Sequence, residues 1–232
     1  MRADIFLEIY RELEDLLEQK YSGKKLHYSS VVFEFLNSED SAPIREKLDL
    51  CREIRNVLTH NSKLGGESVV EPSQTVLNNL KECIDFIKKP PLALNFATPS
   101  DMIMKASFSA NVLKTMSKMY KNGFSHVPVL ENSYFTGIFS MSTVFEYVLK
   151  NPENPINYKT TIRDLDRLLD ISKQSENYYF APRSLSSIEA RKIFEQVQGK
   201  NKRISIIFIT ENGRKNERIL GLLTPWDLMG DK

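Results

Sequence analysis

Arg55, Asn56 and His60, near the end of a predicted helix, have side chains suited to chemistry on an anionic group. A histidine exchanges protons near neutral pH, and a guanidinium stabilises negative charge. Because a helix turns about 100° per residue, Arg52, Asn56 and His60 form one polar ridge. Arg55 falls instead within the apolar stripe of the same helix. A charge there is costly unless it is paired or partly hydrated, so Arg55 requires a partner or a function.

A second polar pair, Thr224 and Asp227, lies in the segment "GLLTPWDL". Thr224 ends a predicted strand, and Asp227 follows in the first turn of a helix. The free N–H groups of a helix N-terminus can bind a phosphate, and a carboxylate there can accept both hydroxyls of a ribose. Helix capping explains the same residues, because threonine is a good N-cap and an acid is favourable in the first turn.

The elements before Pro90 are predicted to be helical. Apolar residues recur at spacings of three and four in a first helix over about residues 5–17, and a short helix is expected over 29–36. Pro43 is expected in the first turn of a third helix that carries Arg55, Asn56 and His60, and Pro72 opens a fourth. "NSKLGGES" separates the last two. Short connections between four helices predict an α-helical bundle.

After Pro90-Pro91 the pattern changes, because two prolines cannot continue a helix. A helix over 110–120 precedes strands over 126–130 and 134–140 and a helix over 141–149. The same order recurs as a helix over 187–198, strands over 203–210 and 218–224, and a helix that begins at "PWDLM". Because "FTGIFSMST" aligns with "ILGLLTPWD", we infer an internal repeat of about 85 residues.

Composition excludes several classes of protein. The 232 residues carry a net charge of +2, with −3 on residues 1–90 and +5 on residues 91–232, so neither part has the basic excess of a dedicated nucleic-acid binder. No apolar run approaches the ~20 residues that cross a bilayer, and the acidic amphipathic N-terminus is unlike a signal peptide. Cys51 and Cys83 lie in apolar patterns and are expected to be reduced, buried thiols in a cytoplasmic protein. We expect no metal site, because metal-ligand spacings such as CxxC and HExxH are lacking.

The repeat resembles a tandem pair of CBS (cystathionine β-synthase) domains, on the segments "GFSHVPVL", "GIFS" and "GLLTPWDL". The resemblance implies an α+β chain of two parts, in which a helical domain (1–90) is followed by CBS domains over 91–157 and 158–232, each a β-α-β-β-α repeat. It also implies an adenosine-containing ligand such as AMP, ADP, ATP or S-adenosylmethionine. Thr224 would contact its phosphate and Asp227 its ribose. Because Thr143 replaces the acid in the first copy, we expect one competent site.

His126 and Arg203 stand at the start of corresponding strands of the two copies. Both residues are candidates to reach ligand phosphates across the cleft between the copies. For His126, an ordinary position at a strand edge is an equal alternative.

The spacing Arg55-Asn56-xxx-His60 resembles the RNxxxH signature of HEPN (higher eukaryotes and prokaryotes nucleotide-binding) domains. That family consists of helical bundles, and many members are metal-independent ribonucleases that act as dimers. The resemblance implies a homodimer in which two His60 side chains meet at one cleft and cleave single-stranded RNA. Proton transfer would fall to His60, stabilisation of the phosphorane to Arg55, and orientation of the base or phosphate to Asn56.

A purely structural role explains the same residues. Arginine and histidine in a last helical turn favour the helix dipole, Asn61 can cap the helix, and Arg55 can pair with Glu8 or Glu12 inside the bundle. The net charge of −3 also opposes RNA binding. Whether the chain is an enzyme therefore stays open. A ribonuclease controlled by an adenine nucleotide is the first hypothesis, and a non-catalytic adenylate sensor whose bundle dimerises or docks a partner is the second. An accessory to another enzyme is the third.

Overall fold

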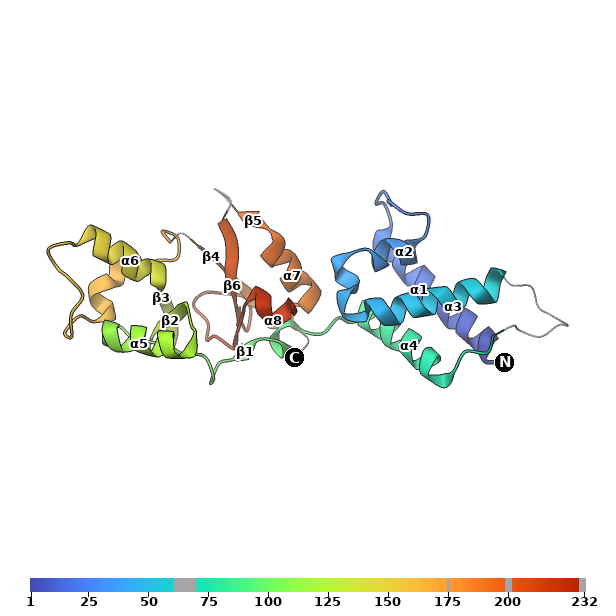
Figure 1. The fold of residues 1–232 in the computed structure, drawn as a ribbon, viewed down its shortest axis with the longest axis horizontal. Coiled ribbons are helices and arrows are strands. Elements are labelled where there is room, and N and C mark those ends of the chain that lie inside the picture. Colours follow the sequence, from blue (N-terminus) through green and yellow to red (C-terminus); the bar gives the residue numbers. More distant parts are fainter. Residues whose placement is uncertain (61–69, 175, 199–201, 230–232) are drawn as a thin grey trace. The chain divides into compact units, whose positions relative to one another are not determined.

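The computed structural model describes residues 1–60, 70–174, 176–198 and 202–229. The chain divides into two compact units, Met1–Pro90 and Pro91–Lys232, and each is described by itself (Figure 1). The first unit is helical and the second mixes helices with strands, so the chain is of the α+β type. No helix within the described ranges has the length and apolar character needed to cross a membrane. The predicted break at "NSKLGGES" and the predicted cap at Asn61 lie outside these ranges.

The first unit contains α1 (Arg2–Tyr21), α2 (Val31–Leu36), a 3-10 helix η1 (Glu39–Ile44), α3 (Arg45–His60) and α4 (Gln74–Lys88). Serine hydroxyls cap the N-termini of α2 and α4. Ser30 accepts a hydrogen bond from the backbone N–H of Phe33, and Ser73 accepts one from that of Val76. Pro43 was expected in the first turn of α3. It lies instead inside η1, which ends just before α3 begins.

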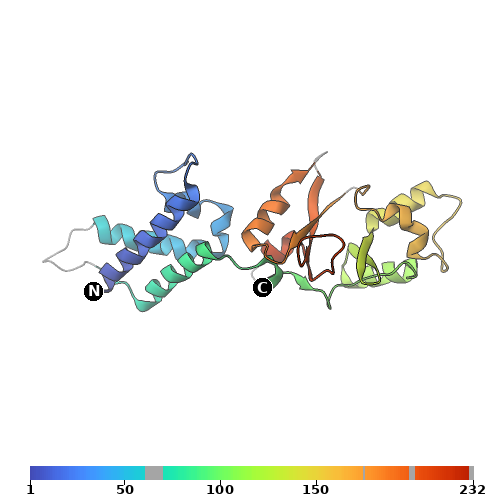
Figure 2. The same cartoon turned by 180° about the vertical axis from the view of Figure 1, so that it is seen from behind.

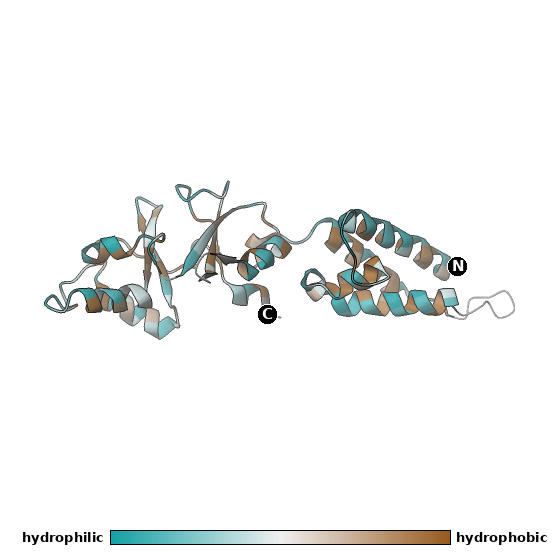
Figure 3. Cartoon of the chain, turned by 90° about the horizontal axis from the view of Figure 1, so that it is seen from above, coloured by the Kyte–Doolittle hydropathy of each residue, from teal (hydrophilic) through white to brown (hydrophobic). Residues whose placement is uncertain are grey.

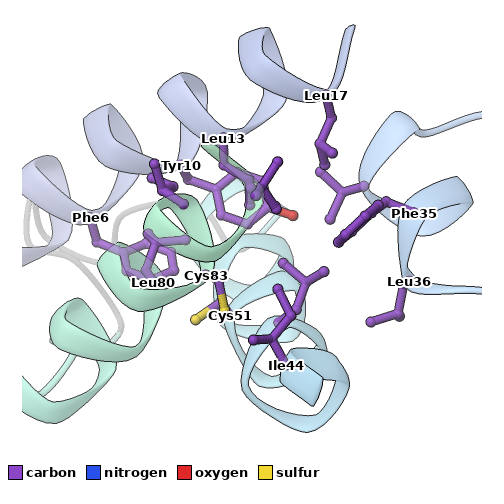
Figure 4. Packing of buried hydrophobic residues seen from close by; sticks show 14 of the residues in the cluster. Phe6, Tyr10, Leu13, Leu17, Phe35, Leu36, Ile44, Cys51, Leu80 and Cys83 are labelled. Carbon is purple, nitrogen blue, oxygen red and sulfur yellow. The ribbon is translucent and has the colours of Figure 1, made fainter. Parts of the chain in front are cut away.

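The apolar stripes of these helices meet in one core. Figure 4 shows Phe6 and Leu13 of α1 packed among side chains of the other helices, and both are fully buried. Cys51 and Cys83 are free thiols in this core. Burial raises the pKa of Cys51 to about 11 and that of Cys83 to about 12, so both stay protonated at neutral pH. The long helices carry both hydrophobic and hydrophilic residues, as the colours in Figure 3 show.

The second unit begins with η2 (Ala93–Asn95) and β1 (Thr98–Pro99). The elements that follow are α5 (Val112–Asn122), β2 (His126–Glu131), β3 (Tyr134–Ser140), α6 (Met141–Lys150), η3 (Ile162–Leu168), β4 (Asn177–Pro182), α7 (Ser187–Glu195), β5 (Val197–Gln198), β6 (Lys202–Thr210), β7 (Gly221–Leu223) and α8 (Pro225–Met229). The predicted order of helix, strand, strand and helix occurs twice, as α5-β2-β3-α6 and as α7-β6-β7-α8.

The strands form two separate sheets, which Figure 2 shows from behind. Strands β2 and β3 form an antiparallel pair, and the second sheet has the order β1-β7-β6-β4, with β5 also paired to β6. Strand β4 runs parallel to β6. The strand predicted over 218–224 is shorter and spans only Gly221–Leu223. The chain before it forms a turn, in which the Glu217 carboxylate accepts hydrogen bonds from the backbone N–H groups of Asn212 and Arg214.

The opening strand of the repeat differs between the copies. In the second copy β4 fills this place. In the first copy Ala106 makes a single parallel bridge to Val129, while β1 pairs with β7 of the second copy. A Cβ added to Gly221 would lie 2.9 Å from side-chain atoms of Leu94 and of Ala97. The absence of a side chain at Gly221 therefore permits these two residues to pack closely against β7.

Aromatic side chains join the two sheets. The Phe135 ring, from β3, lies 5.1 Å from the Phe180 ring and 5.2 Å from the Phe208 ring, measured between centroids. Phe180 and Phe208 are stacked on each other. Because Ile138 and Ile206 belong to the same buried cluster, the two copies share an apolar contact between their sheets.

Candidate functional site

A groove of about 770 Å³ lies on the helical unit. Arg52, Arg55 and Asn56 line it from α3, and Tyr10 and Glu14 line it from α1. Two of the three predicted RNxxxH residues therefore open on one groove. Its volume lies within the range of ~300–1,000 Å³ that is usual for small-ligand sites.

Arg55 is held by contacts to α1. Its Nη2 donates a hydrogen bond to Oε1 of Glu14 at 3.2 Å, and its guanidinium lies 5.7 Å from the centroid of the Tyr10 ring. The prediction that Arg55 pairs with Glu8 or Glu12 is wrong, and Glu12 pairs with Lys88 instead. Tyr10 and Glu14 are four residues apart and share a helix face, whereas Glu12 lies on another side of α1. The Arg55 and Glu14 side chains are 33% and 28% exposed, so the ion pair is partly hydrated.

The other polar residues of α3 differ in their surroundings. Arg52 donates through Nε to Oδ1 of Asp49 at 2.8 Å, and its guanidinium lies 5.4 Å from the centroid of the Phe33 ring. The Asn56 side chain is half-buried on the groove. His60, the last residue of α3, is exposed. It follows Asn56 by one turn on the same face, but it is not among the residues that line the groove.

Sequence reasoning missed Tyr10 and Glu14 as parts of this site. Tyr10 reads as one more member of the apolar stripe of α1, and it is 3% exposed. Burial and, to a smaller extent, the nearby Glu14 carboxylate raise the Tyr10 pKa above its usual range. The phenol is therefore neutral in the folded protein. A regular spacing of four residues from Tyr10 to Glu14 and Glu18 is the one signal that pointed to a shared face.

Thr224 and Asp227 are joined by hydrogen bonds at the start of α8. The backbone N–H and the hydroxyl of Thr224 both donate to Oδ2 of Asp227, each at 2.8 Å. In the first copy, Ser140 and Thr143 occupy the corresponding positions. The Ser140 N–H donates to Oγ1 of Thr143, and the Thr143 N–H donates to Oγ of Ser140, both at 3.2 Å. In both copies the residue that ends the strand donates its backbone N–H to the side chain three positions later, and this side chain is a carboxylate only in the second copy.

The other two predicted ligand residues lie in different surroundings. His126 begins β2, where its Nδ1 lies 2.7 Å from Oγ of Ser125 and its Nε2 contacts the Glu176 carboxylate. That hydrogen bond from His126 is the main reason why the pKa of Glu176 is lowered. Arg203 is exposed on β6 and lies opposite Val197 of β5. Glu176 had no signal in the sequence, because it precedes β4 and lies 50 residues from His126.

Comparisons with known proteins concern mainly the second unit. Residues 98–150 match the family model of the CBS domain. No curated protein matches the chain. The chain is similar to the structure of CbpB in complex with c-di-AMP, with 16% identity and a TM-score of 0.46 over 64% of this chain and 87% of that one.

Two further structures are similar at the same low level of identity. The CBS domain of the bacterial CNNM/CorC family Mg2+ transporter in complex with ATP has 14% identity and a TM-score of 0.43, over 65% of this chain and 91% of that one. A functionally unknown conserved protein domain from Neisseria meningitidis MC58 has 14% identity and a TM-score of 0.47, over 81% of this chain and 99% of that one. The match to the family model by itself identifies a CBS domain in residues 98–150 of this chain.

Proposed function

We propose that residues 91–232 bind an adenosine nucleotide at the start of α8 and that this binding regulates the helical unit. The observation that carries the proposal is the difference between the two equivalent caps. Oδ2 of Asp227 accepts both hydrogen bonds of the second cap, whereas the first cap uses only hydroxyl and backbone groups. A carboxylate beside a helix N-terminus offers strong acceptors to the hydroxyls of a ribose, with backbone N–H groups nearby for a phosphate.

The first copy lacks these properties. Thr143 is 2% exposed, and its hydroxyl lies 3.0 Å from that of Ser140, so it serves the cap and the core. Asp227 is only half-buried. We therefore propose one ligand per chain, with Thr224 on its phosphate side and Asp227 on its ribose. His126 and Arg203 remain candidates to approach the phosphates, and His126 would exchange its contact with Glu176 for one with the ligand.

Calorimetric titration of the full chain tests the proposal. The panel contains AMP, ADP, ATP and S-adenosylmethionine, with c-di-AMP added because it is bound in one of the compared structures. We expect binding in the micromolar to millimolar range by at least one of these compounds, at one equivalent per chain. No heat of binding from any of them, with the protein shown to be folded, contradicts the proposal.

Metal-independent cleavage of single-stranded RNA by the helical unit is a second candidate function. The observation that favours it is the placement of Arg55 and Asn56 on one groove, with Arg52 beside them. Two guanidinium groups and an amide can bind a phosphodiester and stabilise charge on its phosphorane. His60 would supply proton transfer from the end of α3, paired with the same residue of a second copy. The Arg55–Glu14 contact favours the opposite alternative, an inert bundle in a nucleotide sensor.

We further propose that the protein is a cytoplasmic homodimer. The face of α6 exposes large apolar side chains, and Phe145 and Leu149 are 67% and 65% exposed. Both residues lie on one side of the helix, because they are four positions apart. Adjacent apolar side chains of this size on a surface indicate an interaction site. A second copy of the chain is the partner that the resemblance to CBS and HEPN domains predicts.

A further inference from the structure

The groove on the helical unit has two chemically different sides. Arg52, Arg55 and Asn56 provide N–H donors from α3. Glu14 and Glu18 provide carboxylates from α1, one helical turn apart. A simple anion would be attracted by the first side and repelled by the second. The ligand that fits both sides therefore carries negative charge at one end and hydrogen-bond donors at the other.

The donor side has capacity beyond its internal contacts. Arg55 uses Nη2 on Glu14, and Arg52 uses Nε and Nη2 on Asp49. A guanidinium carries five N–H donors, so both arginines can add a bond to a phosphate oxygen. In the described part of the chain, no hydrogen bond involves the Asn56 side chain, although its amide lies on the groove.

Of the two carboxylates on the other side of the groove, one is bonded to an arginine and one can accept hydrogen bonds from a ligand. Glu14 contacts Arg55 through Oε1. The Glu18 side chain is exposed, and no hydrogen bond or ion pair involves its carboxylate within the described residues. Four helical residues rise by about 6 Å, so Glu18 lies about that far along the groove from Glu14. A base attached to a phosphate held at Arg55 can span this separation.

Among the RNA bases, guanine matches a carboxylate best. Its N1–H and N2–H donors lie side by side and point the same way, so they can bond the two oxygens of one carboxylate. Adenine and cytosine each present one amino group beside an acceptor nitrogen, which a carboxylate repels. Uracil presents a single N–H between two carbonyl oxygens. Aromatic rings at the groove, Tyr21 and Phe33, can also contact a base.

We propose that this groove binds a guanine nucleotide, with its phosphate on Arg52, Arg55 and Asn56 and its base on Glu18. The source is either a free guanosine phosphate or an unpaired guanosine in single-stranded RNA. The RNA source rests on the second candidate function. In that case Glu18 would select the base next to the bond that the ribonuclease cleaves.

Binding by the full chain tests the proposal. Fluorescence anisotropy uses labelled UUGU, UUAU and UUUU, and calorimetry uses GMP, AMP, CMP and UMP. We expect UUGU or GMP to bind at least tenfold tighter than its counterparts. Glu18→Gln should remove that preference, because an amide presents one acceptor where a carboxylate presents two. Asp15→Asn is the matched control, because Asp15 is an exposed acid of the same helix outside the groove.

The outcomes separate this proposal from the ribonuclease. A preference for guanine among the free nucleotides alone identifies a free guanosine phosphate as the ligand. A preference for guanine among the RNA oligonucleotides alone identifies single-stranded RNA as the ligand. Equal affinity for all bases, or a guanine preference that survives Glu18→Gln, overturns the proposal. RNA cleavage without base preference, together with equal affinity for the four free nucleotides, overturns it while leaving the ribonuclease intact. Guanine binding without cleavage retains the proposal and refutes the ribonuclease.

Discussion

The Arg55 guanidinium and the Glu14 carboxylate, 41 residues apart, meet at 3.2 Å and join α3 to α1 beside the groove. Their side chains are about one-third exposed. Exposed ion pairs contribute ~0–1 kcal/mol, whereas loss of one partner of a fully buried pair costs ~3–5 kcal/mol. Because this pair is partly hydrated, its contribution to the free energy of unfolding is expected near the lower of these two ranges. Arg55 can therefore stabilise the bundle and still be available to bind a ligand.

A double-mutant cycle measures this contact. We expect Arg55→Met and Glu14→Gln each to lower the free energy of unfolding by about 1 kcal/mol, with a coupling of ~0.5–1 kcal/mol between them. Urea denaturation followed by circular dichroism gives the four values. The pair Lys88 and Glu12 provides the control, because its side chains are more exposed and should couple less. A loss above ~3 kcal/mol for Arg55→Met would favour the inert bundle.

RNA cleavage should depend on His60 but not on metal. If the helical unit is a ribonuclease, the purified chain is expected to cut single-stranded RNA in EDTA and to leave 2′,3′-cyclic phosphate ends. His60→Ala should abolish cutting while changing the free energy of unfolding by less than ~0.5 kcal/mol, because His60 is exposed at a helix end. His27→Ala is the matched control, since His27 is an exposed histidine that contacts Glu34. Equal cleavage by wild type and His60→Ala would contradict a catalytic role of His60.

Ligand binding should distinguish the two caps. Asp227→Asn keeps an oxygen that can accept from Thr224 but removes the charge, so we expect nucleotide affinity to fall at least tenfold with the fold retained. Thr143→Ala should cost about 1 kcal/mol of stability and leave affinity unchanged, because its hydroxyl serves the cap of α6. Calorimetry and thermal denaturation measure the two effects. Equal losses of affinity in both variants would refute a single site at Asp227.

The stability of the second unit should fall in acid through Glu176. The hydrogen bond from His126 lowers the pKa of this carboxyl from its ordinary 4.5. The unfolded chain therefore takes up the proton first, so the stabilisation is present above pH 4.5 and is lost as the pH falls below that value towards the folded-state pKa. Denaturation between about pH 6 and 3 should show a shallower decline for Glu176→Gln. Glu153→Gln, at an exposed site after α6, should follow wild type.

Association should depend on the exposed face of α6. Light scattering at high micromolar concentration is expected to give the mass of a dimer for wild type and of a monomer for Phe145→Glu, because a charge in an apolar interface is costly. Tyr134→Glu changes an aromatic that is 51% exposed on β3 and should leave the mass unchanged. A monomeric wild type would contradict the homodimer and also weaken the two-histidine ribonuclease.

Much of the fold follows from the sequence alone, because the helices and strands depend on the spacing of residues that are close in the sequence. Spacings of three and four predict helices, alternation and β-branched runs predict strands, and Pro90-Pro91 marks the place where the period changes. The repeated order of helix, strand, strand and helix follows from the same local signals. Local spacing also predicts the cap of Thr224 and Asp227, since its two partners are three residues apart.

Tertiary structure alone decided the contacts between distant residues. It placed Glu14 rather than Glu8 or Glu12 beside Arg55, because the packing of α1 against α3 selects which side of α1 faces the groove. It paired His126 with Glu176 and β1 with β7, and these contacts span 50 residues and more than 120 residues, respectively. Helical and strand periodicity fixes which residues share a face of one element. Which two faces then meet depends on how all the elements pack together.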